Sequence, residues 1–300
     1  MKKKNTIFLA VISSLILIVI FLFEFSDFKN NYDLLQEKIS TEKKECLNVD
    51  DADAEYLKYC NLILNEKEYK LDFFTVFGNV FVFSLRNVSY FLFLFVSMPS
   101  LFYISFYFKN KIIFLELTRI SYKKIKKKLF INAYISTLIL TIFTIFGIIV
   151  CFLYTKTFDP SFAIYNSTSL WTINSMNNPI LFIILYVLNI FIHSILYVNI
   201  CLAVVRKQHN YFISLGLSYI AFIAIESILE ILFYGIIFTS LLKTDFGYIF
   251  NIMNLFRLND YHNMIFPIII PFILMIISCF IVNFMYNDKE KLIYDIERNE

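Results

Sequence analysis

The sequence has little glycine and lacks the short motifs that hold nucleotides or catalytic groups. Only five of its 300 residues are glycine, and no two of them form the G-x-x-x-x-G-K-[ST] loop that cradles the phosphates of ATP. Neither the H-E-x-x-H zinc motif nor the G-x-S-x-G turn of hydrolases is present, and the three histidines lie on different segments. We therefore expect a protein that is not an enzyme, with no metal site and no cofactor of its own.

Charge is also scarce. Charged residues make up 17% of the chain and hydrophobic residues 59%, which is far more apolar than an ordinary soluble domain. The net charge is only +3, and the basic residues lie beside apolar runs, so nucleic acid is not an expected partner. The composition indicates that the solvent of this chain is the lipid bilayer.

Six apolar runs are long enough to cross a membrane, which takes roughly 20 residues of helix for a hydrocarbon core of about 30 Å. They cover residues 7–23, 79–108, 129–154, 179–205, 211–242 and 263–286. Because no small-x-small cleavage site follows the first run, we expect it to be a span that is kept, not a signal peptide. The predicted fold is an all-α polytopic membrane protein with one transmembrane domain, residues 1–300.

The placement of Lys and Arg predicts the orientation, because these residues are enriched in short cytoplasmic loops. Lys2–Lys4, the connector 109–128, Arg206 with Lys207, and the basic tail all fall on one side of a six-span arrangement. Both termini are then cytoplasmic. The long segment 24–78 falls on the other side and carries thirteen acidic residues against seven lysines. We expect it to be a small helical extracellular insertion.

Spacing within this extracellular segment predicts two short amphipathic helices, because apolar residues recur every three or four positions. They are Tyr32, Leu35 and Ile39 in the first helix, and Leu57, Cys60 and Leu64 in the second. Cys46 and Cys60 both lie in the segment, and an oxidising exterior would permit a disulfide between them. Two unpaired thiols are the alternative, and the sequence does not choose between them.

Polar and ionisable residues within the spans are candidate functional groups, because they are costly to bury in hydrocarbon. They are Arg86, Asn189, His193, Glu226 and Glu230. Asn189 and His193 are four residues apart, as are the two glutamates, so each pair shares one helix face. One hypothesis pairs Arg86 with either glutamate as a clamp between helices. The other makes the group part of a translocation path or a proton relay.

The connector 109–128 concentrates positive charge: six basic residues occupy ten positions. They are Arg119, Lys123, Lys124, Lys126, Lys127 and Lys128. We expect a short helix in which Ile112, Leu115, Ile120 and Ile125 form the apolar set and the lysines point away. Fixing the topology and attracting anionic lipid would explain the charge by themselves.

The layout as a whole resembles the ABC-2 type transporter permeases, the membrane subunits of many bacterial ABC exporters. The residues that carry the resemblance are Thr118–Lys124, followed by Lys128 and Leu129 at the entry to the third span, with an apolar segment 246–258 before the sixth. The resemblance implies that the connector is a coupling helix that docks on a separate ATPase subunit. The coupling residues would be Glu116, Arg119, Ser121, Lys123, Lys124 and Lys128.

The resemblance also implies the function and the partners. The chain would be the permease subunit of an ATP-driven exporter in a bacterial cell membrane, paired with itself or with a related permease. ATP would bind to the partner subunit, and the cargo would be an apolar or amphipathic peptide or lipid. The alternative is a polytopic binding or immunity protein that captures a toxic peptide without ATP. An ATPase partner is required by the first hypothesis only.

Overall fold

The structure is a computed structural model that describes residues 2–47, 72–157, 178–242 and 266–298. These ranges are almost entirely helical and contain no strand. Six helical segments within them are long and apolar enough to cross a membrane. The predicted all-α fold with six spans is therefore confirmed.

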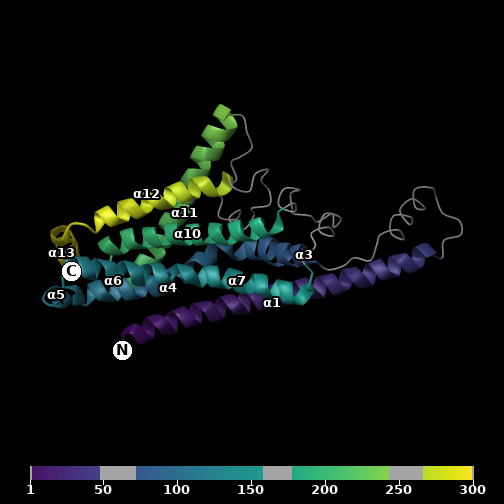
Figure 1. Ribbon diagram of the computed structural model, residues 1–300, viewed down its shortest axis with the longest axis horizontal. Helices are drawn as coiled ribbons and strands as arrows, with labels where there is room; N and C mark the ends of the chain where they lie inside the picture. The colour runs from purple at the N-terminus through teal and green to yellow at the C-terminus, as the bar shows by residue number, and fades with distance from the viewer. Residues whose placement is uncertain (1, 48–71, 158–177, 243–265, 299–300) are drawn as a thin grey trace.

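The first helix, α1 (Lys2–Leu47), is longer than the sequence pattern suggested. We expected a span to end near residue 23 and a separate short helix to follow. Instead α1 continues without interruption, because its 46 residues include neither glycine nor proline to end it. In Figure 1 its C-terminal part projects beyond the other helices. The second predicted helix, around residues 57–64, lies outside the described residues.

The core is formed around α4 (Leu85–Lys109) and α10 (Pro179–Lys207), which lie among the other helices in Figure 1. The short helix α3 (Phe73–Phe77) leads into α4 through the π-helical stretch η1 (Gly78–Ser84). Buried aromatic rings fill the space between these elements, and the rings of Phe77 and Tyr186 are 5.2 Å apart. The core is thus packed with phenylalanine and tyrosine side chains.

The third span consists of two helices, α6 (Tyr122–Ile135) and α7 (Thr137–Thr155). They meet at Ser136, whose hydroxyl donates a hydrogen bond of 2.6 Å to the carbonyl of Ala133. Such local bonds compete with regular helix geometry and bend helices. Within α7, a Cβ on Gly147 would lie 2.0 Å from the ring of Phe81, so the absent side chain lets η1 pack closely.

The lysines that we assigned to the connector lie on α6 instead, so the connector shrinks to α5 (Ile112–Leu117) and a turn at residues 118–121. Part of the predicted apolar set is wrong. Ile125 is buried, but Leu115 is 65% exposed and Ile120 is exposed, whereas Ile113 is fully buried. The cause is the break after Leu117, which ends the helical register before Ile120.

The remaining helices are α11 (Tyr211–Glu230), the π-helical stretch η2 (Ile231–Leu242), α12 (Phe266–Met285) and α13 (Lys289–Arg298). Figure 1 shows the N-terminus and α13 at the same end of the molecule as α5. We call this the connector end, and the opposite one the far end. The side of the membrane that the connector end faces stays a prediction. The apolar segment 246–258 lies outside the described residues.

Candidate functional site

Glu116 ties three helices together at the connector end. It lies on α5 and accepts a 2.7 Å hydrogen bond at Oε2 from the hydroxyl of Tyr107 on α4. Its other oxygen, Oε1, forms an ion pair with Lys128 on α6. The Lys128 ammonium also lies 5.7 Å from the centroid of the Tyr107 ring, a cation–π arrangement. The three side chains form a brace, which we call the Glu116 brace.

The ionisation of Glu116 favours this arrangement. Burial raises the pKa of its carboxyl group, but the hydrogen bonds from Lys128 and Tyr107 outweigh burial and hold the pKa below the ordinary value. The carboxylate is therefore charged at neutral pH and accepts both bonds. Because α5 has only six residues and lacks a side-chain N-cap, the brace is a principal contact that fixes its position.

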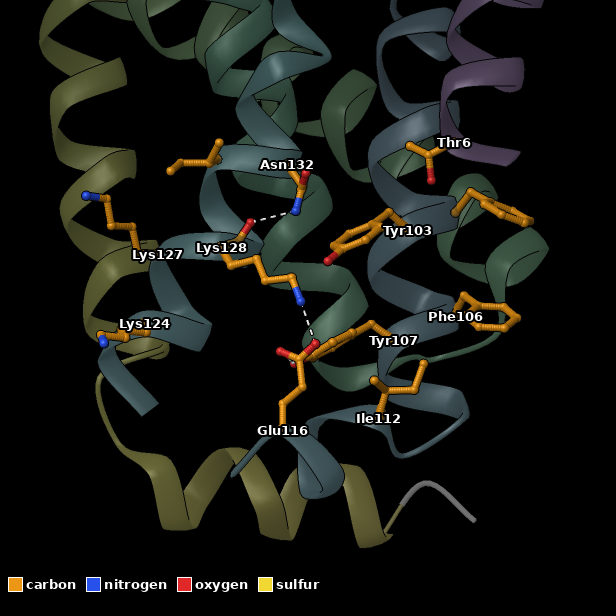
Figure 2. A pocket seen from close by; sticks show the side chains of 12 residues that line it. Thr6, Tyr103, Phe106, Tyr107, Ile112, Glu116, Lys124, Lys127, Lys128 and Asn132 are labelled. Carbon is orange, nitrogen blue, oxygen red and sulfur yellow. Dashed lines mark hydrogen bonds and ion pairs between the residues drawn. The ribbon is translucent and has the colours of Figure 1, made fainter. Parts of the chain in front are cut away.

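A cavity of about 690 Å³ lies beside the brace, between α1, α4, α5 and α6. Figure 2 shows Tyr103, Phe106 and Tyr107 on one side of it, Lys124, Lys127 and Lys128 on the other, and Thr6 at the α1 edge. One wall is thus aromatic and the other is basic. Glu116 is its one acidic lining residue among those described, and its charge is already balanced by Lys128.

The other predicted coupling residues form an exposed basic face. Arg119 and Ser121 lie in the turn between α5 and α6, and Lys123 and Lys124 lie in the first turn of α6; all four are exposed. No ion pair involves Arg119, Lys123 or Lys124 within the described ranges. The structure therefore brings the six predicted residues together as an outward face joined to an inner brace.

A second charged cluster at this end was not predicted. Asp295 on α13 is buried, and its carboxylate accepts hydrogen bonds from Arg206 (2.7 Å) and Lys207 (2.5 Å) at the end of α10. Burial raises the pKa of Asp295, but the bonds from Lys207 and Arg206 outweigh it and lower the pKa. The signal that could have found it is the spacing of Leu292 and Ile296, which places Asp295 on the buried face of α13.

The predicted polar stripe within the spans is buried, as its spacing indicated. Asn189 and His193 on α10 and Glu226 on α11 are each less than 5% exposed. The Nδ1 atom of His193 is 2.9 Å from the carbonyl oxygen of Asn189. Within the part of the chain that is described, His193 Nε2 and Glu226 Oε2 have no hydrogen-bond partner.

Packing in the hairpin of α10 and α11 puts these two groups at one level. The rings of Tyr197 and Phe222 meet across the two antiparallel helices with centroids 4.8 Å apart. His193 and Glu226 each lie one turn further from the 208–210 loop. The arrangement brings a histidine and a carboxyl group to the same depth in the helix bundle.

The predicted clamp with Arg86 stays a prediction. Arg86 is in α4, but its side chain lies outside the described part of the structure. Glu230 is half-buried on α11, one turn beyond Glu226. Among the cysteines, Cys46 is in a disulfide, but Cys60 lies outside the described residues, so their pairing also remains a prediction.

Comparison with known proteins gives no relative: no family model, no curated protein and no solved structure matches the chain. The functional argument therefore rests on the chain's own residues. The six apolar spans and the Glu116 brace identify a multi-pass membrane protein with a braced basic connector at one end.

Proposed function

We propose that this chain is the membrane-spanning permease subunit of an ATP-driven ABC exporter, which couples to a separate ATPase subunit and moves an apolar or amphipathic peptide or lipid out of the cell. The membrane would be a bacterial cell membrane, and the translocator would contain two permease subunits. The observation that carries the proposal is the Glu116 brace, which joins the exposed connector to two membrane-spanning helices.

The brace supports coupling for a mechanical reason. A force on a loose loop is absorbed by rotation of its backbone, whereas a force on a short helix fixed to its neighbours moves those neighbours. α5 is bonded through Glu116 to Tyr107 near the end of α4 and to Lys128 in the middle of α6, within the first part of the third span. A partner that moves α5 would therefore move the second and third spans together, as rigid elements do in shear and hinge motions.

The exposed basic face supports docking of a partner. Arg119, Lys123 and Lys124 project at the same end as the brace and are exposed. Complementary charge at such a face steers association and fixes the docking register. An ATPase subunit with an acidic groove fits this surface, and its own P-loop would supply the nucleotide site.

The test is co-purification from membranes of the native host in mild detergent. The full chain is compared with the double variant Arg119→Glu and Lys123→Glu. The matched control is Lys29→Glu with Lys44→Glu, which makes the same change of charge on exposed residues of α1 toward the far end. We expect the wild type and the control to retain a P-loop ATPase, and the connector variant to lose it at equal expression.

Two results would overturn the proposal. One is the absence of any P-loop protein from the wild-type preparation under conditions that keep other exporters intact. The other is equal retention by all three forms, since docking would then not involve the connector. The first result would favour the binding or immunity protein that acts without ATP, and the second would remove the connector from the docking surface.

A further inference from the structure

A second groove adjoins the Figure 2 cavity along α6, and Lys127 and Ile131 line both. It has a volume of about 960 Å³ and lies between α6, the start of α7, α10 and α12. Its mouth carries Lys123, Lys126 and Lys127, and none of the described residues that line it is acidic. The lining therefore supplies no negative charge to balance these lysines, and only an anionic ligand would balance them.

The side chains that line the groove change from charged to apolar along a single row of α6. Lys123 and Lys127 are four residues apart, and the same row continues through Ile131 and Ile135 to Leu138 in α7. The three apolar members of the row are 44–56% exposed. The face is thus charged at the connector end and apolar toward the membrane interior.

The length of the apolar part matches one leaflet. From Lys127 to Leu138 the helices rise roughly 16 Å, at 1.5 Å per residue. Half of a hydrocarbon core of about 30 Å is roughly 15 Å. A single acyl chain laid along the row would reach from the interface to the bilayer midplane, with Phe191 and Ile195 of α10 forming the opposite wall.

Hydrogen bonds hold the groove open and leave its body apolar. At the mouth, Lys126 donates to the carbonyl of Asn283 on α12 (2.9 Å). Deeper down, the Tyr134 hydroxyl donates to Asn199 Oδ1 (2.5 Å), and the Asn199 amide donates to Ser278 (2.7 Å). The polar groups of the walls are therefore used between helices, whereas Lys123 and Lys127 are exposed and make no ion pair within the described ranges.

We infer that this groove binds an anionic phospholipid of the leaflet at the connector end, with its phosphate on Lys123 and Lys127 and one acyl chain along Ile131, Ile135 and Leu138. Basic pockets between transmembrane helices are suited to anionic head groups. The inference does not depend on an ATPase partner. It assigns to α6 a second role, because bound lipid would sit between α6 and α12.

The test is native mass spectrometry of the full chain in detergent, titrated with phosphatidylglycerol or with phosphatidylcholine. We expect retention of phosphatidylglycerol in preference to phosphatidylcholine. Lys123→Gln with Lys127→Gln is expected to weaken that retention roughly tenfold or more. The matched control, Lys109→Gln with Lys289→Gln, removes equal charge at the same end from exposed lysines outside the groove and is expected to bind as wild type.

A second variant tests the acyl chain without changing charge. Ile135→Trp fills the apolar part of the groove and is expected to reduce lipid retention, whereas Ile135→Val is expected to leave it unchanged. Glycerol phosphate, which has the charge without the tails, is expected not to compete. Equal retention of both lipids, an equal loss in the control, or full competition by glycerol phosphate would each overturn the inference.

Discussion

Two groups of basic residues lie at the connector end, and they differ in whether a carboxylate pairs with them. Arg206 is buried and Lys207 is exposed, and both donate hydrogen bonds to the buried carboxylate of Asp295, which balances one of their two charges. Arg119, Lys123 and Lys124 are exposed and meet no carboxylate within the described ranges. The first group therefore holds the fold together, and the second is available to a partner or to lipid. Charge in a sequence does not by itself distinguish these roles.

Removal of the Asp295 carboxylate should have the largest effect on stability. Asp295→Asn would leave the buried guanidinium of Arg206 without its counter-ion, and breaking a buried pair in this way costs about 3–5 kcal/mol. We expect a lower thermal unfolding midpoint and less protein in the membrane. The control is Glu297→Gln, which removes an exposed charge two residues away on α13. Equal stability of the two variants would show that the cluster is not structural.

Acidification should reproduce part of this effect. Because the pKa of Asp295 is lowered in the folded protein, its contribution is complete above the ordinary carboxyl value, near 4. It is lost as the pH falls through the lowered pKa. We expect release of α13 from α10 in that acidic range, measured by hydrogen exchange of residues 289–298. In the Asp295→Asn variant, which has no carboxylate to protonate at this position, the acid-induced loss of protection of these amides should be absent.

Loss of the Glu116 brace should have a smaller, local effect. Glu116→Gln removes the charge that pairs with Lys128, and we expect a loss of about 1 kcal/mol, because the pair is partly exposed. Hydrogen exchange of residues 112–117 should become faster while that of α10 stays unchanged. The exposed Glu290→Gln serves as the control. Unchanged protection of α5 would contradict the role of the brace.

Neutralisation of the exposed group should have the smallest effect on folding. Lys123→Gln with Lys124→Gln is expected to change the free energy of unfolding by no more than about 0.5 kcal/mol, as for other exposed sites without buried partners. Thermal unfolding in detergent measures this directly. A large loss of stability would remove the distinction between the two basic groups.

Much of the fold could be predicted from the sequence, because length and apolarity suffice to identify a span. The six spans are found near their predicted positions. The continuation of α1 through Leu47 was missed, because a change from apolar to polar residues was taken as the end of a helix. The break at Ser136 was missed as well, since a single serine is no signal by itself.

The site was less accessible to sequence reasoning, for a physical reason. Exposed basic residues are recognisable from composition, but the partners of a charged side chain depend on how distant segments pack. Glu116 meets Tyr107 and Lys128 only because the chain turns twice between α4 and α6. Asp295 meets Arg206 across 89 residues. No local pattern specifies such a contact.

The most direct test of the proposed function is site-specific photo-crosslinking in cells of the native host. A photoreactive amino acid replaces Arg119 at the connector in one strain and Lys44 on the far part of α1 in another. The account predicts that the Arg119 position captures a protein with a P-loop and that the Lys44 position does not. Capture of no P-loop protein at Arg119, or equal capture at both positions, would contradict it.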